Sequence, residues 1–328
     1  MNKHSIIVLI FLMFYPVSLL TGQSEHKSKC DYIASGYYQL VYEAEIAYLE
    51  GNDSLAFAKL QEAEKRCPLI NQPTSKEIEL YCRLLMKNRQ FDKAIAYMDT
   101  LANKYGTFPV NVLIDIGQND ILSKELLKEI PDFYLSEMPR LLQESEWYYY
   151  LPQRNFIIDT LTDICAIDQN VRKERNLDSV NWDKMKETDI LNYKRLFQLI
   201  DKFGFPNTKL YGCANVKMQE RLGALLMHIT DHKDIADTIL QFVREGQCEP
   251  GFYGIVIDRK ILPKSLMENG KPMYLYAGFS NITDDEIIDI EQVDERRTAI
   301  GMPTREMERK KIELLTKRYE QLLQRYGL

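Results

Sequence analysis

Residues 37–68 read YYQLVYEAEIAYLEGNDSLAFAKLQEAEKRCP, and this stretch decides the fold class. Apolar residues recur three and four positions apart on both sides of a polar turn, a spacing that is typical of amphipathic helices. Gly51 turns the chain between the two segments, and Pro68 ends the second one. Small residues, which let two helices approach closely, stand at Ala44, Ala56 and Ala63. The stretch therefore predicts an antiparallel helical hairpin.

A second hairpin with the same organisation follows. Cys82 takes the small position in its first helix, and residues 88–90 form its turn. The corresponding positions Ala56 and Ala94 are 38 residues apart. The two hairpins resemble tetratricopeptide repeats, whose usual period is about 34 residues. The resemblance implies a helical surface that binds a protein or peptide partner, capped by further helices over residues 110–143.

The chain begins with a segment typical of a secretory signal peptide. Lys3 supplies a positive charge, and residues 6–20 are almost entirely apolar. This run is shorter than the ~20 residues of a spanning helix, and small and polar residues follow it. We expect a signal peptide over residues 1–22, cleaved near Gly22 or Gln23, and a periplasmic or secreted product without stable membrane insertion. An uncleaved N-terminal anchor is the alternative.

Export permits disulfide bonds, and all six cysteines follow the predicted cleavage point. In an antiparallel helical hairpin, the start of the first helix lies beside the end of the second, and four cysteines occupy such positions. The predicted pairs are Cys30–Cys67 and Cys213–Cys248, and the predicted free thiols are Cys82 and Cys165. Six reduced, mostly buried cysteines are the alternative.

Four successive aromatic residues over 147–150 mark an expected boundary between two domains. They fill the seam between the domains or, alternatively, line a ligand groove. Residues 31–145 form the expected repeat domain and residues 152–328 a mostly helical domain. Within the second domain, residues 271–279 predict a short strand that pairs with 287–290 in a minor β-hairpin. The expected fold class is therefore mainly α: tetratricopeptide-like helical-hairpin repeats followed by a mostly helical domain with a minor β-hairpin.

Residues 157–301 carry an ordered set of short polar and glycine-containing motifs. They are Asp168-Gln169 with Arg172, Asp189 with Asn192, Gly204-Phe205-Pro206, His228, Asp258-Arg259, Gly270-Lys271-Pro272, Tyr276 with Gly278, Val293-Asp294-Glu295-Arg296-Arg297, and Gly301. This set resembles an uncharacterised bacterial domain-of-unknown-function family. The resemblance implies a domain boundary and candidate residues, but no reaction. Glutamines that the family carries beside its tyrosine-glycine pair are missing here, where Met273, Tyr274 and Ala277 stand.

One histidine and four charged residues form the candidate polar site: His228, Asp258, Arg259, Asp294 and Arg297. In a functional interpretation, His228 acts as a general base and an arginine holds an anion. In a structural interpretation, the charges form a buried ion-pair network that joins helices. The structural one is favoured, because the adjacent Asp258 and Arg259 point in different directions on a helix. A turn between His228 and His232 argues against a metal site.

Composition excludes several classes of protein. The chain has 328 residues, a formal net charge of −6, 45% hydrophobic and 27% charged residues, which excludes collagen-like, disordered and polytopic membrane proteins. The acidic balance argues against a nucleic-acid partner. There is no Gly-x-Ser-x-Gly elbow, phosphate loop or GxGxxG, and we expect no cofactor. We expect an exported, non-enzymatic scaffold that binds a protein or peptide. The alternative is a small periplasmic enzyme, a hydrolase that uses His228, Asp258 and Arg259.

Overall fold

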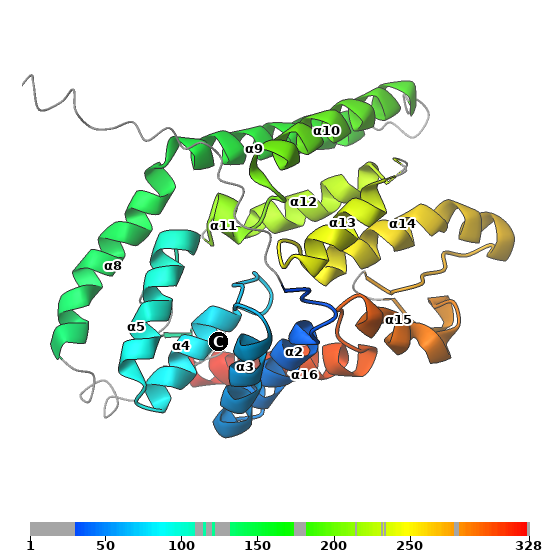
Figure 1. Ribbon diagram of the computed structural model, residues 1–328. Coiled ribbons are helices and arrows are strands. Elements are labelled where there is room, and N and C mark those ends of the chain that lie inside the picture. Colours follow the sequence, from blue (N-terminus) through cyan, green and yellow to red (C-terminus); the bar gives the residue numbers. More distant parts are fainter. Residues whose placement is uncertain are drawn as a thin grey trace, which may run out of the picture.

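A computed structural model describes residues 30–108, 114–115, 120–121, 132–173, 182–213, 215–230, 232, 234–278 and 282–326. The fold is mainly helical, which confirms the predicted class (Figure 1). The predicted signal peptide over residues 1–22 lies outside the described residues. So does much of the expected capping region over 110–143. Two short antiparallel strands, β1 (Ile114–Asp115) and β2 (Asp120–Ile121), occur within that region.

The predicted first hairpin is confirmed. Helices α2 (Tyr37–Leu49) and α3 (Asp53–Arg66) pack against each other along their lengths. Gly51 turns the chain with a φ of 82°, a left-handed conformation that glycine adopts without strain. Asn52 caps α3, because its side chain accepts a hydrogen bond from Leu55 N at 3.1 Å.

The next helices continue the same arrangement. Helix α4 (Glu77–Lys87) packs on α3, and α5 (Phe91–Thr100) packs on α4. The π-helical turn η1 (Leu101–Tyr105) extends α5. In Figure 1 these elements follow one another on the side of the molecule below α9 and α10. The membership of these hairpins in the tetratricopeptide family stays a prediction.

The aromatic residues over 147–150 end helix α8 (Asp132–Tyr150) and divide into two pairs. The hydroxyl of Tyr148 lies 2.8 Å from Lys209 O, and that of Tyr149 donates to Gly106 O at 2.9 Å. Both rings pack directly against Gly106 and Gly212. At either glycine an added Cβ would lie only 2.5 Å from a ring atom, so no larger residue fits there. Two of the four aromatics therefore fill the seam. The other two, Trp147 and Tyr150, are 65% and 77% exposed.

The rest of the chain is a set of helices with little strand structure. The helices are α9 (Pro152–Lys173), α10 (Trp182–Phe203), α11 (Thr208–Tyr211), α12 (Val216–His228), α13 (Ile235–Arg244), α14 (Pro250–Asn269), α15 (Val293–Ala299) and α16 (Arg305–Tyr326), with 3-10 turns η3 (Asp284–Glu286) and η4 (Ile290–Gln292). The expected β-hairpin between 271–279 and 287–290 is wrong in detail. The two segments meet in one bridge, Tyr274 with Ile287, and its direction is parallel. The turns η3 and η4 flank the second segment and keep it from extending into a strand.

The hydrophobic core does not stop at the expected boundary near residues 145–152. One continuous cluster of buried side chains runs from Tyr32 to Val256. Helix α2 lies in its middle: Tyr38 donates to Val243 O at 2.7 Å, and α16 covers the neighbouring surface of α2. A small second cluster gathers around Ala277 and Val293. The two halves of the chain thus share most of their core.

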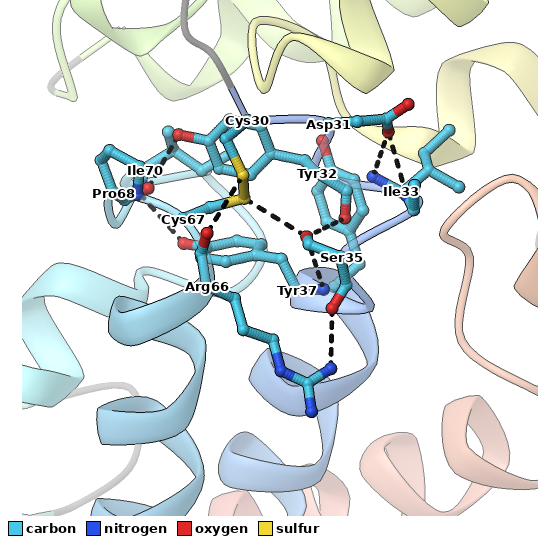
Figure 2. The surroundings of a disulfide bond; sticks show 12 residues. Cys30, Asp31, Tyr32, Ile33, Ser35, Tyr37, Arg66, Cys67, Pro68 and Ile70 are labelled. Carbon is cyan, nitrogen blue, oxygen red and sulfur yellow. Dashed lines mark hydrogen bonds between the residues drawn. A yellow bond between two sulfur atoms is a disulfide. The ribbon is translucent and has the colours of Figure 1, made fainter.

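The structure forms one of the two predicted disulfides. Cys30 and Cys67 are bonded, with Cα atoms 5.7 Å apart, at the open end of the α2–α3 hairpin (Figure 2). Ser35 Oγ lies 3.2 Å from Cys67 Sγ. Cys82 and Cys165 are free and buried, as predicted.

The predicted Cys213–Cys248 bond is wrong, since both cysteines are free. The prediction assumed that α12 and α13 form a closely packed hairpin, but each of them packs more extensively on α14 than on the other. The backbone N–H of Cys213 donates to Tyr105 O at 2.9 Å, which holds this cysteine against η1. The thiol of Cys248 instead donates to Glu249 O at 3.5 Å.

Candidate functional site

Asp258 on α14 binds backbone amides and no other side chain of the candidate site. Its carboxylate accepts hydrogen bonds from the N–H groups of Leu275, Tyr276 and Gly278 at 2.8, 2.9 and 2.8 Å. Burial raises the pKa of Asp258, and the three amide hydrogen bonds partly oppose that shift. The loop lies directly on α14, because a Cβ at Gly278 would be 2.8 Å from Ile255 N. Asp258 therefore fixes this loop to the helix.

Arg297 on α15 holds the other side of the same loop. Its fully buried guanidinium donates to the carbonyl oxygens of Tyr276 and Pro303, each at 2.7 Å. It also pairs with Glu308 on α16 at 2.9 Å. Asp294 Oδ1 accepts a hydrogen bond from Arg305 N at 2.7 Å. These contacts match the structural interpretation of the two residues, which join the loop, α15 and α16.

Arg259 does not join the other members of the candidate site. It lies exposed on α14. Within the described residues it makes no hydrogen bond or ion pair. Across the same part of the chain, no hydrogen bond links His228 to Asp258. The structure therefore does not bring together His228, Asp258 and Arg259, the three residues of the alternative hydrolase hypothesis.

His228, the last residue of α12, lies against a carboxylate that the sequence did not predict as its partner. Its Nδ1 lies 3.0 and 2.9 Å from the two carboxylate oxygens of Asp168 on α9. Arg172 donates to the Asp168 carboxylate at 2.7 Å and to Asp189 on α10 at 2.6 Å. Gln169 donates to Asp168 at 2.9 Å. We call His228, Asp168, Arg172 and Asp189 the interhelical polar cluster.

Asn192 lies on α10, which is joined to α9 by two ion pairs. Ion pairs Arg172–Asp189 and Asp163–Arg195, both 2.6 Å, set the antiparallel register of α9 and α10. Asn192 lies one turn from Asp189 on α10. Asn192 is fully buried, and neither its Oδ1 nor its Nδ2 has a hydrogen-bond partner among the described residues. Burial raises the pKa of Asp189, while Arg172 opposes the shift.

His228 and His232 contact different side chains. His232 stacks on the ring of Tyr193, with centroids 3.6 Å apart and planes 11° from parallel. His228 instead points to Asp168. In the described part of the chain, no group of three or more His, Cys, Asp or Glu side chains is arranged to hold a metal ion.

A small cavity lies where the loop after Pro68 meets the second half of the chain. Its volume is about 30 Å³, room for one or two waters. Glu249 lines it, and burial raises the pKa of this carboxyl to about 7. The Glu249 carboxylate accepts from Gln219 Nε2 at 2.5 Å. The size and polarity of the cavity suit an internal solvent site.

The signal for the interhelical polar cluster was present in the sequence as spacing. Asp168 and Arg172 are four residues apart, and Asp189 and Asn192 are three apart, so each pair shares one face of its helix. The contact of Asp168 with His228 spans 60 residues and depends on how three helices pack.

Comparison of the chain with protein-family models, with curated proteins and with solved structures finds no match. Both resemblances seen in the sequence therefore stay predictions. Among the helices of the described residues, none combines the length and the apolar character needed to cross a membrane.

Proposed function

We propose that this protein is an exported scaffold that binds a protein or peptide partner. The observation that carries the proposal is the pair Trp147 and Tyr150, 65% and 77% exposed and one turn apart on α8. Their neighbours Tyr148 and Tyr149 anchor the same turn in the seam through hydrogen bonds to backbone carbonyls. Aromatic side chains on a rigid element lose little conformational entropy on binding, which suits them as interface anchors.

Exposed apolar residues continue beyond the end of α8. Leu151 is 45% exposed, and Phe156 at the start of α9 is 52% exposed. Lys202 on α10 lies 5.5 Å from the centre of the Phe156 ring. An apolar centre with a charged edge is the usual anatomy of a protein interface.

Two further observations support a binding role and export. Asp258 and Arg297 form hydrogen bonds mainly with the backbone, which leaves them little capacity for catalysis. The Cys30–Cys67 disulfide is typical of an oxidising compartment. The alternative, a small hydrolase that uses His228, Asp258 and Arg259, requires a convergence of these side chains that has no support in the contacts above.

Site-specific photo-crosslinking tests the proposed function. A photoreactive phenylalanine analogue replaces Trp147 in one variant and Met267 in the other, and both proteins are irradiated in the exporting cell. Met267, on α14, is a matched control because it is apolar and 81% exposed. We expect a discrete crosslinked partner from position 147, absent when Tyr150→Ser is added, and none from 267. No product at 147, or the same products at both positions, would contradict the proposal.

A further inference from the structure

The loop over residues 70–76, which we call the seam loop, lies between the α2–α3 hairpin and the second half of the chain. We propose that the seam loop is a pH-sensitive latch, closed while Glu77 and Glu249 are protonated and released when they ionise. The latch is separate from the exposed aromatic residues of α8 and does not depend on the proposed scaffold function.

The seam loop is hydrogen-bonded to the second half of the chain at three places. Thr208 on α11 donates to the carbonyl oxygen of Asn71 at 2.8 Å, and Lys311 on α16 donates to that of Thr74 at 3.2 Å. The side-chain amide of Gln72 donates to a carbonyl oxygen just before α14 at 3.4 Å. Release of the loop therefore loosens the joint between the two halves.

Two carboxyl groups hold the seam loop, one from each half of the chain. Glu77, the first residue of α4, accepts hydrogen bonds from Gln72 N at 3.1 Å and from Ser75 Oγ at 2.6 Å. Glu249, just before α14, accepts from Thr74 N at 3.4 Å. Glu77 is fully buried, and Glu249 is half-buried and lines the small cavity beside the loop. Opening of the loop breaks these bonds and brings water to both carboxyl groups.

The charges around the two carboxyl groups do not balance their ionised forms. Lys311 donates to both carboxylate oxygens of Glu45, at 3.0 and 2.9 Å, so its charge is already matched. Neither Glu77 nor Glu249 forms an ion pair with a described residue. The titratable and charged groups that surround them are Tyr37, Tyr38, Tyr42 and Glu45 on α2, Lys76 and Glu79 at the start of α4, Tyr105 on η1, Lys209 and Tyr211 on α11, Cys248 before α14, and Lys311 on α16. Ionisation in the closed loop would therefore leave two unpaired negative charges in the seam.

The direction of the pH response follows from burial. Burial raises the pKa of Glu77 to about 8 and that of Glu249 to about 7, from the value of 4.5 that both carboxyl groups have in water. The closed loop therefore binds more protons than the open loop between about pH 4.5 and pH 8. The open state gains as pH rises through this window. We expect the equilibrium constant for opening to increase at least about tenfold from pH 5 to pH 8.

Hydrogen exchange of two loop amides, corrected for the intrinsic rate at each pH, tests the latch. The N–H of Gln72 is bonded to Glu77, and that of Lys76 is bonded to Gln72 O at 2.8 Å, so both amides exchange when the loop opens. We expect their protection to fall at least about tenfold from pH 5 to pH 8, and to stay below that of the amides inside α3. Equal protection in the loop and in α3 would mean that the loop opens only with the whole protein, and would overturn the proposal.

Variants of the two carboxyl groups identify the titrating residues. Glu77→Gln combined with Glu249→Gln keeps both side chains neutral at every pH, and we expect the protection of its loop amides not to vary with pH. Glu220→Gln is the matched control, because it removes an exposed carboxylate of α12, and we expect it to behave as the wild type. The proposal fails if wild-type protection does not vary with pH, if the double variant keeps the wild-type response, or if the control loses it.

A third variant changes the response without removing either carboxyl group. Gln219 Nε2 donates to the Glu249 carboxylate at 2.5 Å, and this bond favours the ionised form. In the Glu77→Gln background, where Glu249 alone titrates in the latch, Gln219→Leu should raise the pKa of Glu249. We expect protection to go on falling to a higher pH than in Glu77→Gln alone. An unchanged profile would mean that Glu249 does not control the loop.

Discussion

Asp258 binds three backbone amides with one carboxylate, so its replacement leaves three partly buried donors unpaired. We expect Asp258→Ala to lower the free energy of unfolding by about 2–4 kcal/mol, measured by urea denaturation. Asp294→Ala is the matched control, because Asp294 accepts a single backbone hydrogen bond, and we expect a loss of about 1 kcal/mol. Equal losses in the two variants would show that the loop over 273–278 does not depend on Asp258.

Glu77, at the start of α4, should make stability depend on pH. Burial raises the pKa of this carboxyl from 4.5 to about 8, although hydrogen bonds from Ser75 and Gln72 N oppose the shift. The folded state therefore binds more protons than the unfolded state between about pH 4.5 and pH 8. The free energy of unfolding falls as pH rises through this window.

Glu77→Gln removes the titrating group. We expect the decrease in the free energy of unfolding across this pH window to be smaller in the variant by a few kcal/mol. Urea denaturation at a series of pH values measures the effect. Glu62→Gln serves as control, because Glu62 is a surface carboxylate that pairs with Arg66 on the outside of α3. An unchanged slope in Glu77→Gln would mean that Glu77 ionises normally in the folded protein.

Part of the candidate site was predictable from the sequence. The structural interpretation rests on Asp258 and Arg259, which are neighbours on a helix and point apart. Arg297 pairs with Glu308, as an ion-pair network requires, whereas Asp258 binds backbone amides. Their partners were not predictable, since Asp258 binds backbone N–H groups, which every residue but proline carries. Asp168 was missed as the partner of His228 because helix packing alone brings them together.

At the scale of elements, the Cys30–Cys67 disulfide closes the α2–α3 hairpin. It spans 37 residues, and the chain-entropy model gives it about 3–4 kcal/mol of stabilisation. We expect non-reducing peptide mapping to find the 30–67 link alone. Cys213 and Cys248 should both be alkylated when the protein is treated with an alkylating reagent under denaturing conditions. Cys30→Ser with Cys67→Ser should lower stability by the stated amount. A 213–248 link would contradict the packing of α12 and α13 on α14.

Helices were predictable wherever apolar residues recur at helical spacing, as in α2 and α3. Pairing between elements was less predictable. The expected hairpin over 271–290 is reduced to one parallel bridge. Asp258 and Arg297 bind the backbone N–H and carbonyl of Tyr276 in the first segment, so these groups are not available to a second strand. The second disulfide failed for the same kind of reason, since α14 lies against both helices that were expected to pair with each other.

At the scale of the whole molecule, the shared core predicts cooperative unfolding. The buried cluster runs from Tyr32 to Val256 without a break at residues 145–152. We expect one calorimetric transition whose measured enthalpy equals the van't Hoff enthalpy. We also expect residues 152–328, produced alone, to lack native near-UV circular dichroism, because Tyr38 no longer covers α13. Two separate transitions would indicate two independent domains.

Export is a second prediction at this scale. The charged start, apolar run and small residues of the first 22 positions predict cleavage near Gly22 or Gln23. N-terminal sequencing of protein from the periplasm should begin between Gln23 and Glu25. Recovery of intact Met1 from the soluble cytoplasm would contradict both the localisation and the compartment proposed for the disulfide.

The position of α16 against α2 has a consequence for the order in which the chain folds. Lys311 reaches Glu45 across 266 residues, and Arg318 reaches the carbonyl of Tyr48 across 270. The Cys30–Cys67 loop can close once its 37 residues have emerged, but the flank of α2 stays uncovered until almost the entire chain is present. Contacts between residues so far apart in the sequence slow folding. Until α16 is present, the uncovered flank of α2 is prone to aggregation. If the chain is exported as proposed, we therefore expect it to depend on a holding chaperone until α16 is available to cover α2.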